Sequence, residues 1–259
     1  MWWMGAVAAV LVTGLAAGAE QAAPVPGAYA ILGLERVTVR AGARIESGAV
    51  GAYRGEVRLG PGVRVDGTVA ADTIRVAPGA RVADLFCRLI VGPERFSCGA
   101  LSVPVVDLSA LPIVQVLAGA ADLRVPAAAR TAPLAAGAYG AVRVGTRGRL
   151  LLAGGDYAVR SVTVATRGRL LCAAPCRVQV EGRIVLRGRA LVGPAGPVDG
   201  VRLSVEGDAV VTGPRAIVAG SVYAPGGEIR LGSRGRSTGS LVGRSVVVGT
   251  HARVTGGAT

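Results

Sequence analysis

The stretches VRVGTRGRLLL (142–152) and VTVATRGRLLC (162–172) decide the fold of this chain. Each begins with alternating β-branched residues, turns at a short corner that contains Gly, and continues with a second apolar run. Alternation with a period of two predicts a short strand with one buried face, and Gly at a fixed place predicts the turn that follows it. A single unit cannot bury its own apolar face, so we expect the units to stack on one another.

The same pattern recurs through most of the chain, and neighbouring copies start 17 to 22 residues apart. A repeat of this length, built from short strands and turns, predicts an all-β fold, a β-solenoid of Gly-punctuated coils. A β-sandwich is the alternative, but it would need hairpin signals such as Asn-Gly, and the chain contains no Asn. The other copies are VTVRAGARIESG (37–48), VRLGPGVRVDG (57–67), IRVAPGARVAD (74–84), IVLRGRALVG (184–193), IRLGSRGRSTG (229–239) and VVVGTHARVTG (246–256).

Residues 99–135 interrupt the repeat, because prolines stand among Ala and Val and neither the alternation nor the Gly spacing continues. We therefore expect N-terminal coils in residues 20–98, an irregular linker or insertion at 99–135, and C-terminal coils in 136–259.

The N-terminus resembles an export signal. Residues 5–19 are apolar and uncharged, and Ala17-Gly18-Ala19 fits an A-x-A cleavage site. The apolar stretch is shorter than the ~20 residues that a membrane-spanning helix needs. We predict a signal peptide over residues 1–19 and an exported protein with no transmembrane segment after cleavage; an uncleaved anchor is the alternative.

Four cysteines fit an exported protein, because the periplasm and the cell exterior oxidise thiols. Four cysteines allow three pairings. We favour the two local disulfides, Cys87 with Cys98 and Cys172 with Cys176, since each closes a short loop. A zinc site is the alternative, but the spacings C-x10-C and C-x3-C match zinc motifs poorly, and we expect no metal.

Catalytic signals are weak. Glu206 and Asp208 are the best pair among the 16 acidic residues, but a solvated strand face explains them much better than catalysis does. His251 is the single histidine, and it stands at a repeat corner where other copies carry Arg. We expect no enzyme activity, no catalytic residues and no cofactor, and a polysaccharide-active enzyme is the least favoured alternative.

Positive charge is the strongest functional signal. All 29 basic residues are Arg, the net charge is +13, and Arg-Gly-Arg recurs. In a solenoid, residues one coil apart stack, so the 20-residue steps between Arg147, Arg167 and Arg187 predict a ladder of like charges. Such a ladder is a solvated face, a face neutralised by nearby acids, or a site for an anionic partner. Acidic polysaccharide or lipopolysaccharide fits, whereas specific nucleic-acid binding does not, since aromatic residues make up 3% of the chain. The candidate binding residues are Arg147, Arg149, Arg167, Arg169, Arg187, Arg189, Arg234 and Arg236.

Two stretches resemble known repeats. VRLGPGVRVDGTVAADTIRVAPGARV (57–82) is similar to bactofilin coils. GAYGAVRVGTRGRLLLAGGDYAVRSVTV (137–164) and GSVYAPGGEIRLGSRGRSTGSLVGRSVVVGTHARV (220–254) resemble exported bacterial proteins with no assigned activity. Bactofilins are cytoplasmic head-to-tail polymers, typically without a signal peptide or disulfides, so this chain departs from them in both respects.

Open solenoid ends expose strand edges that can pair with other copies. The short tail after Val254 leaves little to cover the last coil, so we expect that coil to be exposed and to support self-association through terminal coils. The favoured function is an exported envelope or surface scaffold that assembles end to end. The alternative is a binding module or adhesin that holds anionic glycans or lipopolysaccharide on the stacked Arg face.

Overall fold

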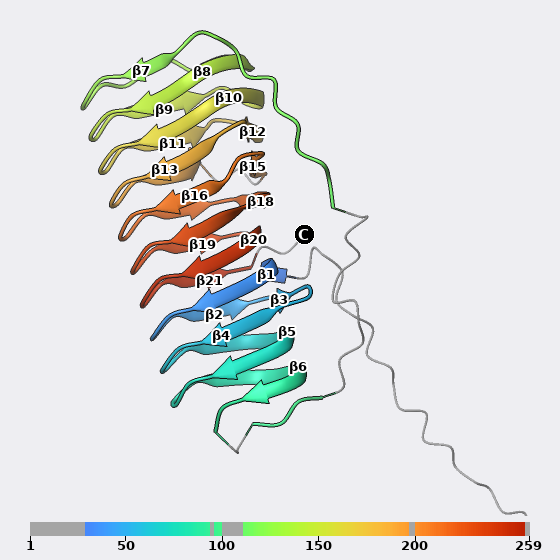
Figure 1. Cartoon of the computed structure of the whole chain (residues 1–259). Coiled ribbons are helices and arrows are strands. Elements are labelled where there is room, and N and C mark those ends of the chain that lie inside the picture. Colours follow the sequence, from blue (N-terminus) through green and yellow to red (C-terminus); the bar gives the residue numbers. More distant parts are fainter. Residues whose placement is uncertain (1–28, 94–95, 100–110, 197–199, 257–259) are drawn as a thin grey trace, which may run out of the picture.

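A computed structural model describes residues 29–93, 96–99, 111–196 and 200–256. The predicted signal peptide and its cleavage site lie outside the described residues. Twenty-one strands form one continuous parallel sheet that winds into a rod (Figure 1). The predicted all-β solenoid is therefore confirmed. Among the described residues, no helix is long and apolar enough to cross a membrane.

The strands fall into two blocks. The N-terminal block holds six strands: β1 (Tyr29–Val39), β2 (Arg44–Ser47), β3 (Ala49–Ala52), β4 (Glu56–Leu59), β5 (Arg64–Val76) and β6 (Arg81–Val91). The C-terminal block holds fifteen: β7 (Leu123–Val125), β8 (Gly137–Val144), β9 (Arg149–Leu152), β10 (Gly155–Val164), β11 (Arg169–Cys172), β12 (Cys176–Val180), β13 (Arg183–Leu186), β14 (Leu191–Pro194), β15 (Val201–Val205), β16 (Ala209–Thr212), β17 (Ile217–Ala219), β18 (Ser221–Leu231), β19 (Arg236–Thr238), β20 (Leu241–Val248) and β21 (Arg253–Thr255).

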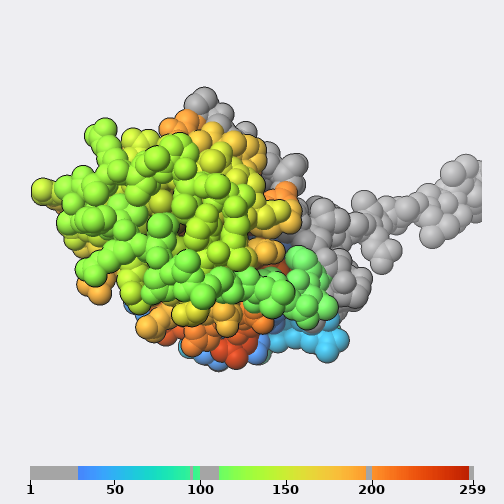
Figure 2. Space-filling model, turned by 90° about the horizontal axis from the view of Figure 1, so that it is seen from above, coloured from blue at the N-terminus to red at the C-terminus, as the bar shows by residue number. Residues whose placement is uncertain are grey.

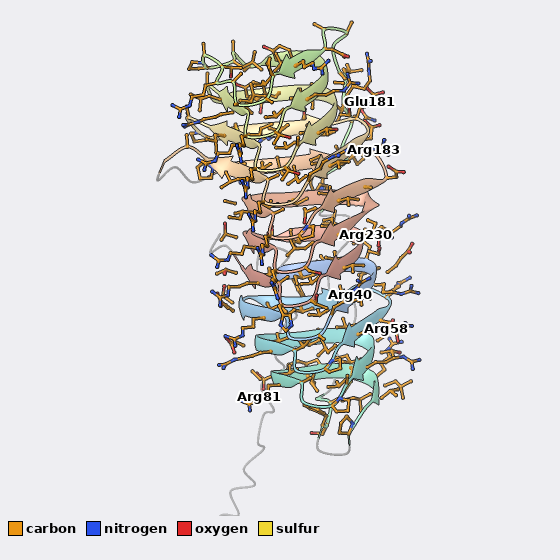
Figure 3. The ribbon with its side chains drawn as sticks, turned by 90° about the vertical axis from the view of Figure 1, so that its left-hand side faces the viewer. Arg40, Arg58, Arg81, Glu181, Arg183 and Arg230 are labelled. Carbon is orange, nitrogen blue, oxygen red and sulfur yellow. A yellow bond between two sulfur atoms is a disulfide. The ribbon has the colours of Figure 1, made fainter. Side chains whose placement is uncertain are left out.

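Each coil has three faces. Face A contains β4, β13 and β16, and face B contains β2, β9, β11, β14, β17, β19 and β21. Face C contains β3, β12 and β15. Strands β1, β8, β10, β18 and β20 bend from face C into face A, whereas β5 and β6 begin on face B and run through face C into face A. The turn from face A to face B is the sharp corner on the left of Figure 1. Figure 3, with this corner toward the viewer, shows Arg58 and Arg230 of face A at one edge and Arg81 of face B at the other.

The blocks do not follow one another in space as they do in sequence. β1 pairs in parallel with β20, and β2 pairs with β21, so the first N-terminal coil lies directly on the last C-terminal coil (Figure 1). The expectation of an exposed last coil is therefore wrong. The rod ends instead at β6 and at the coil that begins with β7.

Residues 111–122 run along the C-terminal block and connect its two ends (Figure 1). The Tyr223 hydroxyl donates to the Pro112 carbonyl (2.7 Å), and the Val116 amide donates to Glu206 Oε2 (2.9 Å). Stacking resumes at β7, which pairs with β8, so a coil forms before residue 136. Figure 2 shows this coil, in green, over the end of the rod.

The core is a column of small aliphatic side chains. Strand alternation turns every second residue inward, and Val37 of β1 stacks on Val246 of β20 with neither side chain exposed. A narrow rod has room for Val, Ile, Leu and Ala, which explains the low aromatic content. The two local disulfides, Cys87–Cys98 and Cys172–Cys176, are confirmed. The first closes the loop after β6, and the second lies inside the core between β11 and β12.

Candidate functional site

The corner between faces A and B is built from the same three positions in each coil. The first residue is at least partly exposed, the second has a positive φ, and the third is a small residue turned toward the core. A residue with an L side chain costs roughly 1–2 kcal/mol in this left-handed conformation, and Gly avoids that cost. The second position is Gly in the N-terminal block (Gly42, Gly62 and Gly79). In the C-terminal block it is Ala128, Arg147, Arg167, Arg189, Arg215, Arg234 and His251.

Backbone hydrogen bonds hold these positions in line. The amide of each second-position residue donates to the carbonyl of the first-position residue in the next coil, as Arg167 does to Gly188 (3.1 Å) and Arg189 to Pro214 (2.9 Å). The series passes without a break from the C-terminal to the N-terminal block, because His251 donates to Ala41 (3.0 Å). The five arginines are therefore stacked one per coil. We call Arg147, Arg167, Arg189, Arg215 and Arg234 the corner row.

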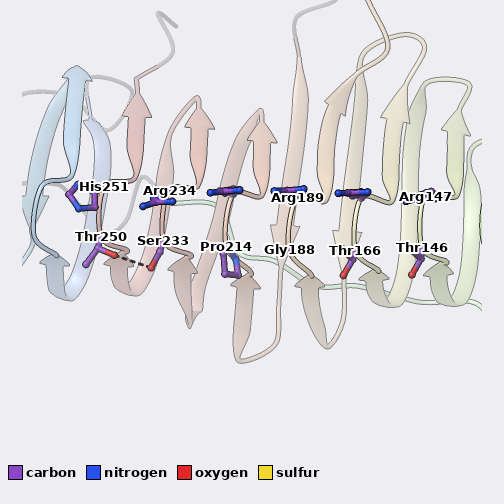
Figure 4. Close-up of a pocket in the computed structure, with 12 residues that line it drawn as sticks. Thr146, Arg147, Thr166, Gly188, Arg189, Pro214, Ser233, Arg234, Thr250 and His251 are labelled. Carbon is purple, nitrogen blue, oxygen red and sulfur yellow. Dashed lines mark hydrogen bonds between the residues drawn. The ribbon is translucent and has the colours of Figure 1, made fainter.

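A shallow open groove of about 630 Å³ runs along the corner row (Figure 4). Beside each guanidinium lies a small first-position residue, so no large side chain interrupts the groove. The hydroxyls of Thr250 and Ser233 are hydrogen-bonded to each other (3.0 Å) across two coils. The first-position residues are Thr146, Thr166, Gly188, Pro214, Ser233 and Thr250.

Within the described residues, no carboxylate forms an ion pair with any member of the corner row. Arginines elsewhere on the rod do have such partners: Arg64 Nε lies 2.6 Å from Asp66 Oδ1, and Arg253 Nε lies 2.8 Å from Glu46 Oε1. All five corner-row side chains are exposed. Five like charges thus stand one strand spacing apart, about 4.8 Å, without a neutralising partner.

Four of the candidate arginines, Arg147, Arg167, Arg189 and Arg234, come together in this row. Arg187 does not stack on Arg167, so that predicted step is wrong. The register Arg169↔Leu191 makes this coil 22 residues long, which brings Arg189 onto Arg167 and leaves Arg187 two positions earlier.

Arg215 is a member that sequence reasoning missed, because it is followed by Ala216 and Ile217 and so belongs to no Arg-Gly-Arg motif. A usable signal was present: a small buried residue follows every corner-row arginine, Ala216 after Arg215 as Gly168 after Arg167.

In three of the four Arg-Gly-Arg motifs (147–149, 167–169 and 234–236), the second arginine lies on face B, whereas in 187–189 it is the corner residue itself. Arg149 pairs in register with Arg169, and Arg236 with Arg253, but Leu191 and Ile217 separate these two groups. The row then continues into the N-terminal block through Arg44, Arg64 and Arg81. Arg64 and Arg253 are paired with acids, so this face B row is partly neutralised.

The weak catalytic candidates, Glu206, Asp208 and His251, each lie in a turn or corner where they make structural contacts. Glu206 lies in the turn after β15, where it accepts the Val116 amide and so anchors residues 111–122. Asp208 is in the same turn, and its carbonyl accepts the Glu228 amide (2.9 Å). His251 continues the corner positions, and its ring lies so close to Gly42 that a Cβ there would be 2.5 Å from Nδ1. Among the described residues, no three His, Cys, Asp or Glu side chains gather as a metal site would require.

No protein-family model matches the chain, and no curated protein matches it. Among solved structures, the chain is similar to an ice-binding protein from an Antarctic bacterium, Flavobacteriaceae. The two are 12% identical with a TM-score of 0.36, over 89% of this chain and 81% of that one. At this level of similarity the neighbour carries no information about what this chain binds. The β-solenoid is established here by the strand register of the chain itself, and its repeats support a structural or binding protein.

Proposed function

We propose that this protein is an exported binding module that holds anionic glycans along the corner row. The corner-row arginines are exposed, lie in one line and have no ion-pair partner among the described residues. A guanidinium group donates through a planar fork that matches a carboxylate or a phosphate. A linear polyanion laid in the groove would give each arginine a partner.

The observation that carries this proposal is the positive φ of the corner arginines. Arg147, Arg167, Arg189, Arg215 and Arg234 all have φ between 56° and 58°. The N-terminal block makes the same corner with Gly, which shows that the fold does not need Arg there. Backbone strain and charge repulsion at five successive coils are typical of a site kept for binding. A bound polyanion would remove the repulsion.

The two disulfides support an oxidising compartment, which agrees with the predicted export signal. Outside the cytoplasm, the anionic saccharides are acidic polysaccharides and the phosphorylated or carboxylated sugars of lipopolysaccharide. Both present oxygen anions on a glycan, and the corner row recognises that shared chemistry. The face B row adds charge beside the groove at Arg149, Arg169 and Arg236.

The test compares two triple variants of the purified protein with its disulfides formed. Arg167→Gly, Arg189→Gly and Arg215→Gly together remove the centre of the corner row and keep the corner backbone. Arg177→Ala, Arg202→Ala and Arg244→Ala remove the same charge from exposed positions outside the groove. Binding to polygalacturonate and to lipopolysaccharide is measured by calorimetry over a salt series.

We expect the corner variant to bind at least about tenfold more weakly, equivalent to about 1.4 kcal/mol, with a shallower salt dependence. The control variant should lose much less affinity. Equal losses in the two variants would mean that net charge alone attracts the glycan, and the proposed site would be wrong.

End-to-end assembly is a second candidate function, favoured by one observation. Leu89 and Val91 on the terminal strand β6 are 55% and 41% exposed, and among the described residues the outer edge of β6 is paired only at the bridge from Phe86 to Gly99. An open apolar edge strand is a template for a second copy. Sedimentation over a concentration series should then show oligomers that Leu89→Arg with Val91→Arg abolishes. A monomer at every concentration excludes the scaffold.

A further inference from the structure

The corner row has a fixed repeat. Its five arginines occupy consecutive coils, because each backbone hydrogen bond joins one corner to the next. With strands about 4.8 Å apart, the guanidinium groups from Arg147 to Arg234 extend over about 19 Å. The groove beside them presents one cationic group per step and is parallel to the rod axis (Figure 4).

The row has defined ends. Toward β7 the same corner position is Ala128, which carries no charge. In the other direction His251 lies against Gly42, and the next corners are Gly62 and Gly79. A ligand therefore finds five arginines in succession, followed by a stretch of uncharged corner positions.

The lining of the groove also limits the ligand. The described lining residues include no Phe, Tyr or Trp, so the groove lacks the aromatic platforms that typically stack the bases of a single-stranded nucleic acid, apart from His251 beyond one end of the row. Hydroxyl groups of Thr146, Thr166, Ser233 and Thr250 lie beside the guanidinium groups. Hydroxyls both donate and accept hydrogen bonds, as sugar hydroxyls do.

We infer that the preferred ligand is a linear acidic polysaccharide with a carboxylate on every sugar residue, bound along the rod with one sugar per coil. This inference rests on the proposed function and deepens it. A sugar ring in an extended chain is about as long as one coil step, so such a chain carries about as many carboxylates along the row as there are arginines. A glycan charged on every second sugar would leave arginines unpaired, and one with several charges per sugar would leave anions unpaired.

The experiment uses galacturonate oligomers from dimer to octamer and hyaluronan oligomers, which carry a carboxylate on every second sugar. Calorimetry at low salt is performed on the wild-type protein, Arg147→Gly and Arg189→Gly. Arg147→Gly removes an end of the row and leaves four consecutive arginines. Arg189→Gly removes the same group from the centre and leaves two pairs.

We expect affinity for galacturonate to rise steeply up to the pentamer and then level off. A hyaluronan oligomer with as many carboxylates as the pentamer should bind about tenfold more weakly or worse. For the galacturonate hexamer, Arg189→Gly should lose more affinity than Arg147→Gly, because it leaves two separate pairs of arginines where Arg147→Gly leaves four in succession.

The outcomes separate this inference from the proposed function. If binding depends on the corner row but follows total charge alone, regardless of charge spacing or row continuity, the carboxylate-per-sugar inference is wrong and the polyanion site stands. Tight binding of an oligodeoxynucleotide of equal charge would likewise overturn the glycan preference. If neither galacturonate nor hyaluronan binds but lipopolysaccharide does, only the carboxylate-per-sugar inference fails; if none of the three binds, or if the central corner triple variant binds them as wild type does, both proposals fail.

Discussion

The two blocks of this solenoid make the same corner in different ways. In the N-terminal block the residue with positive φ is Gly42, Gly62 or Gly79, and in the C-terminal block it is Arg in five successive coils. The corner backbone is equivalent, since the hydrogen bonds between coils follow one pattern through both blocks. The difference is therefore in side-chain chemistry alone.

This comparison separates what the fold requires from what a function would require. The solenoid requires a left-handed residue at the corner, followed by a small buried one, and Gly-Ala at 42–43 satisfies it. Arginine meets the same geometric demand at a cost in strain and repulsion. The corner row is accordingly the part of the surface that packing does not explain.

The comparison is meaningful only if the two blocks form one stack. A charge buried at their junction should therefore have the largest effect on the free energy of unfolding. Val246→Asp places a carboxylate against Val37, where both side chains are fully buried. A buried, unpaired charge should lower the free energy of unfolding by about 4 kcal/mol or more. Chemical denaturation followed by circular dichroism measures the loss.

Val247→Asp is the matched control for the junction, because Val247, which follows Val246 in β20, points outward and is only partly buried. It should change the free energy of unfolding by less than about 1 kcal/mol. Equal stability of the two variants would mean that β1 does not pack on β20 in solution.

Replacing corner arginines with glycine should stabilise the protein. In the variant Arg167→Gly, Arg189→Gly, Arg215→Gly, each substitution relieves roughly 1–2 kcal/mol of strain in the folded state. Each also stabilises the unfolded state by about 0.5–1 kcal/mol, because Gly makes the unfolded chain more flexible. We expect a net gain of about 2 kcal/mol, which raises Tm by about 4–8 °C for a chain of this size. Calorimetry without ligand measures it, and a lower Tm would show that the arginines stabilise the corner.

Sequence predicted the fold because every coil repeats the same local rule. Alternating apolar residues, a corner Gly and a small inside residue recur in both blocks, and each signal is local. The disulfides were predictable for the same reason, since Cys87 with Cys98 and Cys172 with Cys176 are neighbours along the chain.

The order of the coils was not predictable in this way. β20 pairs with β18 along one edge and with β1 along the other, and both pairings are parallel and involve the same stretch of β20, so nothing local records which coil lies next. The register of the corner row was hidden as well, because the coil from Arg167 to Arg189 is two residues longer than the coil before it. Arg187 was therefore assigned to the row in place of Arg189.

Introducing Arg into the N-terminal corner should have a smaller effect. Gly62 has φ of 64°, and a Cβ built there meets no atom within 4 Å, so Gly62→Arg adds strain without a clash. We expect the free energy of unfolding to fall by about 1 kcal/mol. Gly62→Ala carries the same strain without charge, so the difference between the two variants isolates charge repulsion. No loss in either variant would contradict a corner cost of this size.

The smallest expected effect compares one face A position in the two blocks. Glu56 and Glu228 belong to the same outward row, joined through Ser245 and Arg36. Burial tends to raise the pKa of Glu56, but its hydrogen bonds to Arg58 and Arg75 outweigh that effect and lower the pKa. Glu228 instead has one arginine partner, Arg230, at 2.8 Å.

Because the pKa of Glu56 is lowered on folding, its carboxylate stabilises the protein at neutral pH, and that contribution is lost as pH falls through the folded-state pKa. Glu56→Gln should therefore reduce the free energy of unfolding by a few tenths to about 1 kcal/mol at pH 7, as exposed ion pairs do. The difference from wild type should shrink toward zero in acid. Glu228→Gln should cost less at pH 7, since it breaks a single pair. A difference that grows on acidification would reverse the sign of the Glu56 contribution and show that burial, not the two arginines, governs this carboxylate.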